Sequence, residues 1–176
     1  ISVNRAPTYM IANVPSLLMS ADAFIEPWHE SDIRNKIALV ISEEAPMSLS
    51  MLTKRVVQSY GIARAGSRIQ NHINAILSKM KLQTTVQEDV VFYWDNNQNP
   101  DEYVGFRVNG DGENKRDIRD VPVQEVANAA YVVLYEQISM GQDDLLREIA
   151  NKLGYTRLGN NVIAALTLGI KYAQKQ

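Results

Sequence analysis

The pattern of apolar and polar positions repeats along the chain with a spacing of 93 residues. Thirteen positions match without a gap, and they keep apolar with apolar, Gly with Gly and Arg with Arg. The match runs from Ile33 to Leu77 in the first copy and from Val126 to Ile170 in the second. A repeat of about 45 residues in constant register predicts two copies of one three-helix unit.

The first copy begins with apolar residues at the spacing of one helical face, which predicts a helix over about 31–44 with Ser31 as its N-cap. Pro46 cannot continue that helix, and Ser48 offers a cap for a second one. The second helix is expected to close at Gly61, and a third helix follows the turn after it. Two helices joined by a short glycine-containing connection resemble a helix-turn-helix.

After the third helix the pattern becomes extended. Two runs of β-branched and aromatic residues, Thr84–Val86 and Val90–Trp94, are separated by three polar residues and predict a hairpin. Three helices followed by a hairpin form the winged-helix arrangement. The aromatic residues of the second run, Phe92–Trp94, have two open uses: stacking on bases, or packing beneath the hairpin.

The fold class predicted is therefore mainly α with a small β-hairpin, built as tandem winged-helix or helix-turn-helix repeats. The connecting stretch is rich in Asn, Asp, Gly and Pro, with one strand-like piece at 103–108, and Asp143 and Asp144 favour the start of a later helix. We expect four parts: an extended lead-in over 1–29, a winged-helix repeat over 30–95, a connector over 96–120 and a helix-turn-helix repeat over 121–176.

The amino-acid composition disfavours disulfides, metal sites and membrane-spanning segments. The chain has 176 residues, no cysteine and two histidines, which disfavours disulfides and zinc sites. No apolar run is long enough to cross a bilayer, and no leader pattern is present, so we expect a cytoplasmic chain with no membrane partner, no metal and no cofactor. The start at Ile1 and the extended opening suggest a piece of a larger protein.

The two copies of the repeat differ in their local charge. The formal net charge is −2, yet no acidic residue lies between Glu44 and Glu88, where six cationic residues fall. The matching window of the second copy is nearly neutral. A local excess of one sign is tolerated best where a partner of opposite charge binds.

The third helix of the first copy carries the candidate interface. With Ile69 and Ile73 inward, its polar residues share the opposite face, where Asn, Gln and Arg can pair with base edges and Lys or Arg can neutralise phosphates. The alternative is a solvated helix face. The candidate nucleic-acid-binding residues are Lys54, Arg55, Arg64, Ser67, Arg68, Gln70, Asn71, Asn74, Lys79 and Lys81.

Other features are less specific. Arg64 and Arg157 occupy a Gly-x-x-Arg-x-Gly pattern in both copies, so a structural role at the helix end is favoured over a phosphate grip. The pattern lacks the spacing of a nucleotide-binding loop. Three adjacent acid pairs fit turn and helix-end chemistry better than catalysis, which needs groups that converge from separate elements. These pairs are Glu43-Glu44, Glu88-Asp89 and Asp143-Asp144. His72 is open to a phosphate contact or to plain exposure.

Several of these motifs occur together in a known family. The runs Ile41–Met47, Leu52–Ile69, Arg116–Ile118 and Leu153–Gly159, with Arg107, resemble the uncharacterised domain at the C-terminal end of large bacterial superfamily I helicase-like proteins that carry a restriction-endonuclease-like domain. The resemblance covers roughly residues 24–172 and implies a parent protein that handles DNA using ATP. It supplies no catalytic residue here, because the ATPase and nuclease motifs of such proteins lie in other domains.

The sequence thus predicts a non-catalytic DNA-binding accessory module of a helicase-like protein. The alternative is a module that docks on the parent motor domain or on a partner subunit. An enzyme in its own right is not expected, because no nucleophile, base and metal set converges.

Overall fold

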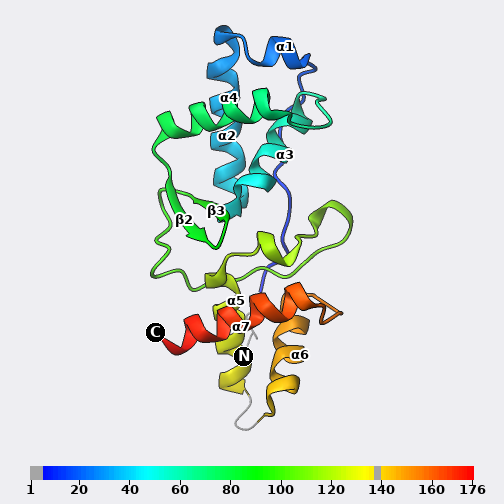
Figure 1. Cartoon of the computed structure of the whole chain (residues 1–176), viewed down its shortest axis with the longest axis vertical. Helices are drawn as coiled ribbons and strands as arrows, with labels where there is room; N and C mark the ends of the chain where they lie inside the picture. The colour runs from blue at the N-terminus through cyan, green and yellow to red at the C-terminus, as the bar shows by residue number, and fades with distance from the viewer. Residues whose placement is uncertain (1–5, 137–139) are drawn as a thin grey trace. The chain divides into compact units, whose positions relative to one another are not determined.

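The computed structural model describes residues 6–136 and 140–176, and its chain divides into two units. The first, here called the N-terminal unit, comprises residues 11–98. The second, here called the C-terminal unit, comprises residues 1–10 and 99–176. The first five residues of the predicted lead-in and residues 137–139 of the predicted second repeat lie outside the described residues. Figure 1 labels the α-helices of both units and the strands β2 and β3.

Three helices supply most of the core of the N-terminal unit: α2 (Glu30–Glu44), α3 (Leu49–Ser59) and α4 (Ser67–Met80). Their predicted inner faces are confirmed, because the apolar positions spaced three or four residues apart are buried in one cluster. The cap of α3 is also as predicted: the Ser48 hydroxyl accepts a hydrogen bond from the Met51 amide at 3.2 Å. The predicted Ser31 cap is wrong, since α2 begins one residue earlier with His29 at its N-cap position.

The hairpin is formed by β2 (Gln83–Gln87) and β3 (Val90–Trp94), which are joined by a two-residue turn and pair in antiparallel register, with Val86 opposite Val91. A short strand that the sequence did not predict, β1 (Met47–Ser48), pairs with the other edge of β3 and completes the order β1-β3-β2. The aromatic rings of β3 serve the core, because Phe92 and Trp94 are fully buried.

The lead-in is not extended throughout. Residues 21–24 form the short helix α1 (Ala21–Phe24) and residues 27–29 a 3₁₀ turn, η1 (Pro27–His29). Before them the backbone runs beside the end of α3, where the Leu17 amide donates to the Ser59 carbonyl at 2.9 Å. Phe24 is fully buried, so this segment is anchored in the core of the N-terminal unit.

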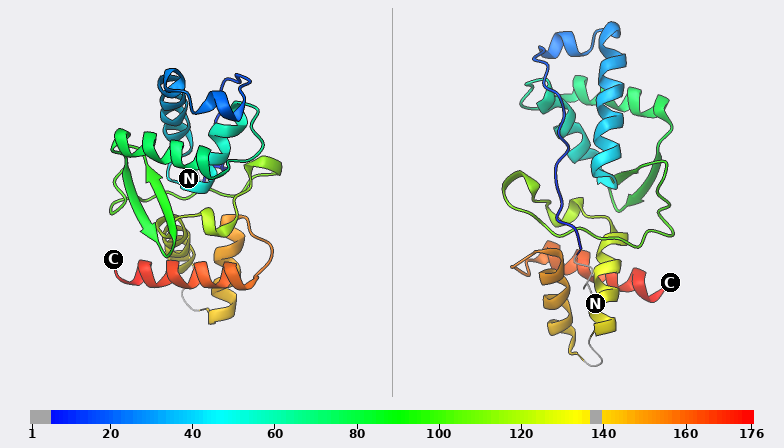
Figure 2. Two further views of the ribbon diagram at one scale, coloured as in Figure 1. Left: turned by 45° about the horizontal axis from the view of Figure 1, so that its top comes forward. Right: turned by 180° about the vertical axis from the view of Figure 1, so that it is seen from behind.

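The C-terminal unit contains α5 (Val123–Glu136), α6 (Gln142–Leu153) and α7 (Asn160–Gln174), with α7 packed across α5 (Figures 1 and 2). These helices begin at residues 123, 142 and 160, and α2, α3 and α4 begin at 30, 49 and 67, so each pair keeps the 93-residue spacing. Gly61 and Gly154 follow corresponding helices and both have positive φ, 72° and 87°. Burial differs most clearly at one repeat position, where Ile41 is buried and Leu134 is 43% exposed; Val162 is also less buried than its counterpart Ile69.

The connector contains no strand at 103–108. Its only bridge there is a parallel one between Thr8 and Val108, and its regular elements within the described chain are the 3₁₀ turns η2 (Gly112–Asn114) and η3 (Ile118–Asp120). Residues 6–10 lie beside it, with the Tyr9 amide donating to the Val108 carbonyl at 2.8 Å. The connector is therefore held by a sequence-distant segment and by side chains rather than by a strand partner.

None of the helices in the described residues has the length and apolar character that a membrane crossing requires. In the same residues, no group of three or more His, Cys, Asp or Glu side chains is placed to hold a metal ion.

Candidate nucleic-acid interface

The exposed face of α4 follows from the position of its buried face. Ile69, Ile73 and Ile76 are buried at 4% exposure or less and anchor the helix to the core. In an α-helix, side chains two positions away from these buried isoleucines point to the opposite side of the helix, which is the solvent side here. Ser67, Asn71 and Asn74 are all exposed. The helix thus presents a row of short polar side chains over its first two turns.

Two unpaired cations lie near the start of this row. The Gln70 amide nitrogen donates to the Thr53 hydroxyl at 3.1 Å and to the Asn74 amide oxygen at 2.9 Å. The first of these bonds places α3 beside the first half of α4, and Lys54 is the exposed residue that follows Thr53 on α3. Arg64 lies in the turn that leads into α4. Lys54 and Arg64 are exposed and form no ion pair within the described chain.

Two other predicted cations carry acidic partners, one from α1 and one from the first turn of α2. Arg68 pairs with Asp22 at 2.5 Å, and Lys79 pairs with Glu30 at 2.7 Å. The hydrogen bond from Lys79 lowers the pKa of Glu30. Exposed pairs of this kind contribute little to stability, so a phosphate can displace the carboxylate at small cost. The charge of the α4 flank is nevertheless reduced in the free protein.

Arg55 does not belong to this surface. Its guanidinium is 9% exposed and forms a two-point ion pair with the fully buried Glu44, at 2.8 and 2.9 Å. Glu44 also accepts a hydrogen bond from the Ala12 amide at 2.9 Å. The predicted contact of Arg55 with nucleic acid is therefore replaced by a structural role, and turn chemistry does not explain Glu44.

The remaining predicted residues occupy separate places. Lys81 is exposed beyond the end of α4, in the left-handed conformation with φ 52°. Arg64 and Arg157 are exposed and, in the part of the chain that the structure describes, make no hydrogen bond to the carbonyls at the preceding helix end. His72 packs its ring edge-on against Phe24 at 5.8 Å with Nε2 buried, so its predicted solvent-side role does not hold.

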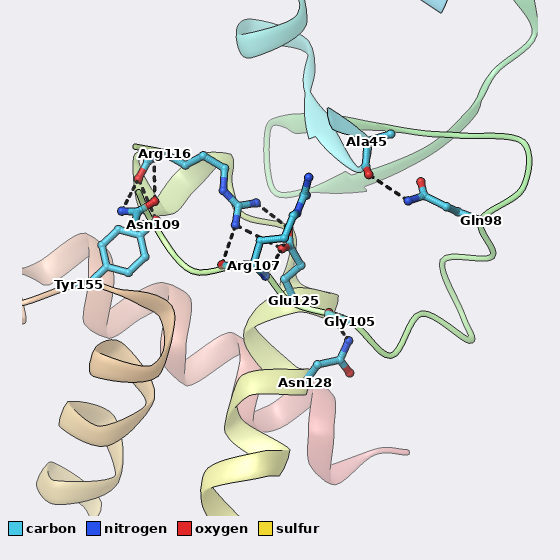
Figure 3. A network of polar contacts seen from close by, with 9 residues as sticks. All are labelled: Ala45, Gln98, Gly105, Arg107, Asn109, Arg116, Glu125, Asn128 and Tyr155. Carbon is cyan, nitrogen blue, oxygen red and sulfur yellow. Dashed lines mark hydrogen bonds and ion pairs between the residues drawn. The ribbon is translucent and has the colours of Figure 1, made fainter. Parts of the chain in front are cut away.

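The sequence did not predict the largest polar cluster, which lies in the C-terminal unit (Figure 3). Glu125, on the first turn of α5, is fully buried between Arg107 and Arg116. Arg116 Nη1 lies 2.6 Å from Glu125 Oε2, and Arg107 Nη2 lies 2.9 Å from the same oxygen. The Arg107 amide also donates to Glu125 Oε1 at 2.9 Å. One carboxylate therefore orients two arginines and a stretch of connector backbone.

Aromatic side chains enclose this cluster. The guanidinium carbons of Arg116 and Arg107 lie 4.5 and 5.0 Å from the ring centre of Tyr9, which is fully buried. The Tyr155 hydroxyl donates to the Arg116 carbonyl at 2.8 Å, and burial raises the pKa of that hydroxyl. These contacts tie residues 6–10 and the turn after α6 to the connector.

The electrostatics of the cluster predict a specific pH dependence. Burial opposes ionisation of Glu125, but the charges and hydrogen bonds of Arg116 and Arg107 together outweigh it and lower its pKa from 4.5 to about 2. Because the folded-state pKa is depressed, this stabilisation is complete above the unfolded-state value near 4.5 and is lost as the pH falls toward 2.

We therefore expect the free energy of unfolding of the wild type to exceed that of Glu125→Gln by a constant amount from about pH 5 to 8, and by less below that range. Urea titrations followed by circular dichroism at several pH values measure this difference. A difference that widened on acidification would contradict the assigned charge state.

Sequence signals for the cluster were weak. Arg107 and Arg116 appeared only within the family resemblance, and Glu125 resembled an ordinary acid in the first turn of a helix. Buried charge is not visible in a sequence pattern when its partners come from irregular segments. Arg116 and Tyr155 also line a cavity of about 820 Å³, and Arg116 Nε is buried without a hydrogen-bond partner in the described residues. The ion pairs of both arginines with Glu125 nevertheless give the cluster a structural role.

Comparison with known proteins gives one match. Residues 22–71 match a family model described as a protein of unknown function (DUF3320). This stretch contains α1, α2, α3 and the beginning of α4, and with them Lys54, Arg64 and Arg68. The resemblance is thereby confirmed as far as an uncharacterised domain. No curated protein and no solved structure matches the chain.

Proposed function

We propose that the N-terminal unit is a winged-helix module that binds DNA through α4. The order of its elements supports this: α2, β1, α3 and α4 are followed by the antiparallel hairpin β2-β3, with β1 on the other edge of β3. In this arrangement α4 is the second helix of a helix-turn-helix, the position that enters the major groove in such modules. On the same proposal, α5, α6 and α7 are a second copy of the three-helix unit.

The observation that carries the proposal is the composition of the exposed α4 face. Asn71 and Asn74 present amide groups, which pair with the N6 and N7 edge of adenine, and Ser67 can contact phosphate or a base edge. No acidic residue occurs from 45 to 87, so this face carries no fixed negative charge of its own. The acids paired with its cations, Asp22 and Glu30, come from α1 and from the first turn of α2.

The cations that remain available are Lys54, Arg64 and Arg68, at the N-terminal end of α4. Lys79 and Lys81 lie toward its other end, beyond the row of amide side chains. The tip of the β2-β3 turn carries Glu88 and Asp89, both exposed, which would repel phosphate. The proposed contact therefore uses the helix and the turn before it, and the wing is not part of it.

The wider context is also a proposal. The resemblance to the C-terminal part of helicase-like proteins suggests that this chain is a non-catalytic accessory that positions DNA for an ATP-dependent enzyme. A module that docks on protein is the second candidate. It is favoured by the exposed apolar residues of the lead-in, Leu18 at 84% and Trp28 at 72% exposure.

Salt dependence separates these two candidates. With three phosphates neutralised by Lys54, Arg64 and Arg68, log affinity should fall against log salt with a slope near −2.7, or about 40-fold from about 50 to about 200 mM salt. Titration of the chain with labelled single-stranded, duplex and forked DNA by fluorescence anisotropy measures this slope. Each of Lys54→Ala and Arg64→Ala should reduce the slope by about 0.9.

Two controls sharpen the experiment. Lys171→Ala removes an exposed cation of α7 and should leave binding unchanged. Asp22→Asn releases Arg68 from its acidic partner and should strengthen binding. Absence of salt-sensitive binding to every DNA form, together with a stable complex with a motor domain of the proposed parent, would replace the DNA hypothesis by the docking one.

A further inference from the structure

A groove of about 350 Å³ lies on the C-terminal unit, lined by residues 100–104, by α5 and by the end of α7. This volume is near the lower end of the range for small-molecule pockets, and it is large enough for one or two side chains of a partner protein. Tyr103, Tyr131 and Tyr172 line it, together with small apolar residues of both helices. The groove belongs neither to the α4 face nor to the buried cluster around Glu125.

Its rim is held in shape before anything binds. The Asn128 amide nitrogen on α5 donates to the Tyr103 carbonyl at 2.9 Å. It also donates to the Gly105 carbonyl at 2.7 Å (Figure 3). These bonds tie the irregular 100–104 segment to α5. A preformed wall lowers the ordering cost of binding.

The surface around the groove is unusually apolar. Tyr131 is 66% exposed, and Leu134 and Tyr135, three and four residues later on α5, are 43% and 83% exposed. Val104 on the opposite wall is 87% exposed. A contiguous apolar surface of this kind marks an interaction site more often than plain solvent exposure, and tyrosines are common anchors in interfaces.

The charged residues on the groove wall indicate which class of ligand it binds. Asp101 and Glu102 are exposed on its wall and form no ion pair within the described chain. None of the residues that line it is a lysine or an arginine. Two carboxylates beside three tyrosine rings favour a cation, through charge and through contact with aromatic faces, and disfavour a phosphate.

We propose that this groove docks a partner polypeptide by receiving an arginine or lysine side chain together with an adjacent apolar side chain. The apolar side chain lies against Tyr131 and Val104, and the cation lies between the tyrosine rings and the two carboxylates. The site is independent of DNA binding by α4, because its charge has the opposite sign and it lies on the other unit.

A pair of capped dipeptides tests the proposal: acetyl-Phe-Arg-amide and acetyl-Phe-Glu-amide, which share the apolar group and differ in charge. Selective ¹³C labelling of the eight tyrosines allows their ring signals to be followed by NMR in the whole chain. We expect the arginine dipeptide to shift the signals of Tyr103, Tyr131 and Tyr172, and to bind at least tenfold more tightly than the glutamate dipeptide. Tyr9 and Tyr60 are fully buried elsewhere and should not move.

The double variant Asp101→Asn, Glu102→Gln should lower affinity for the arginine dipeptide at least fivefold while the fold, checked by circular dichroism, is retained. Glu136→Gln removes an exposed acid of α5 outside the groove and should have no effect. Equal binding of the two dipeptides, the absence of shifts at the three groove tyrosines, or an unchanged affinity in the double variant would each overturn the proposal.

Discussion

Replacing Glu125 with alanine is expected to destabilise the C-terminal unit by about 3–5 kcal/mol. The substitution leaves two arginines without their counter-charge, and the side chains of Arg116 and Arg107 are only 2% and 13% exposed. The Arg107 amide loses its acceptor as well. An unpaired buried charge costs far more than the ion pair contributes when intact, which makes this the largest effect expected of any single substitution in the unit.

Hydrogen exchange of α5 peptides, measured by mass spectrometry, reports this change, because both tryptophans lie in the N-terminal unit. Glu136→Ala on the same helix is the matched control. Its carboxylate is half-exposed and pairs with Lys152 at the surface, so its loss should cost less than about 1 kcal/mol. Equal protection in the two variants would show that the buried cluster carries little of the stability.

Replacing Arg55 with alanine is expected to destabilise the N-terminal unit by a similar amount, about 3–5 kcal/mol. The substitution leaves Glu44, which is fully buried, with the Ala12 amide but without its cation. Urea unfolding followed by the fluorescence of the buried Trp94 measures the effect. A Trp28→Phe background removes the signal of the other tryptophan, which is 72% exposed.

The neighbouring cation provides the comparison. Lys54→Ala removes an exposed charge from the same helix and should change the free energy of unfolding by no more than about 0.5 kcal/mol. Under the proposed function, Lys54→Ala weakens DNA binding and leaves folding stability nearly unchanged. A stable, folded Arg55→Ala variant with weakened DNA binding would restore Arg55 to the interface and contradict its structural assignment.

The two buried clusters share one design. In each unit a buried glutamate of the first long helix binds arginine and also accepts a backbone amide from an irregular segment: Glu44 from Ala12, and Glu125 from Arg107. Such a contact gives a segment without regular hydrogen bonds a defined position. It offers a physical reason why residues 11–20, which have no strand or helix, and the connector, which has only two 3₁₀ turns, take defined positions.

Local features were predictable from the sequence. The periods of α2, α3 and α4, the Ser48 cap, the closing glycine after α3 and the β2-β3 hairpin each depend on residues a few positions apart. The stability of each of these features depends largely on residues that are close to it in the sequence. The strand β1 was missed because two residues show no period, and the strand expected at 103–108 is absent because its backbone pairs with residues 6–10 and with side chains.

The candidate interface shows the same division. The sequence alone determined the three-helix pattern, its repetition at a spacing of 93 residues, and which face of α4 is polar, because side-chain direction on a helix follows from its period. Only the tertiary structure decided that Arg55 is buried on Glu44, that Arg68 and Lys79 are paired with acids, and that an acidic, tyrosine-lined groove forms on the other unit. Those outcomes depend on contacts between residues far apart in the chain, and neither spacing nor composition encodes which distant charge a side chain meets.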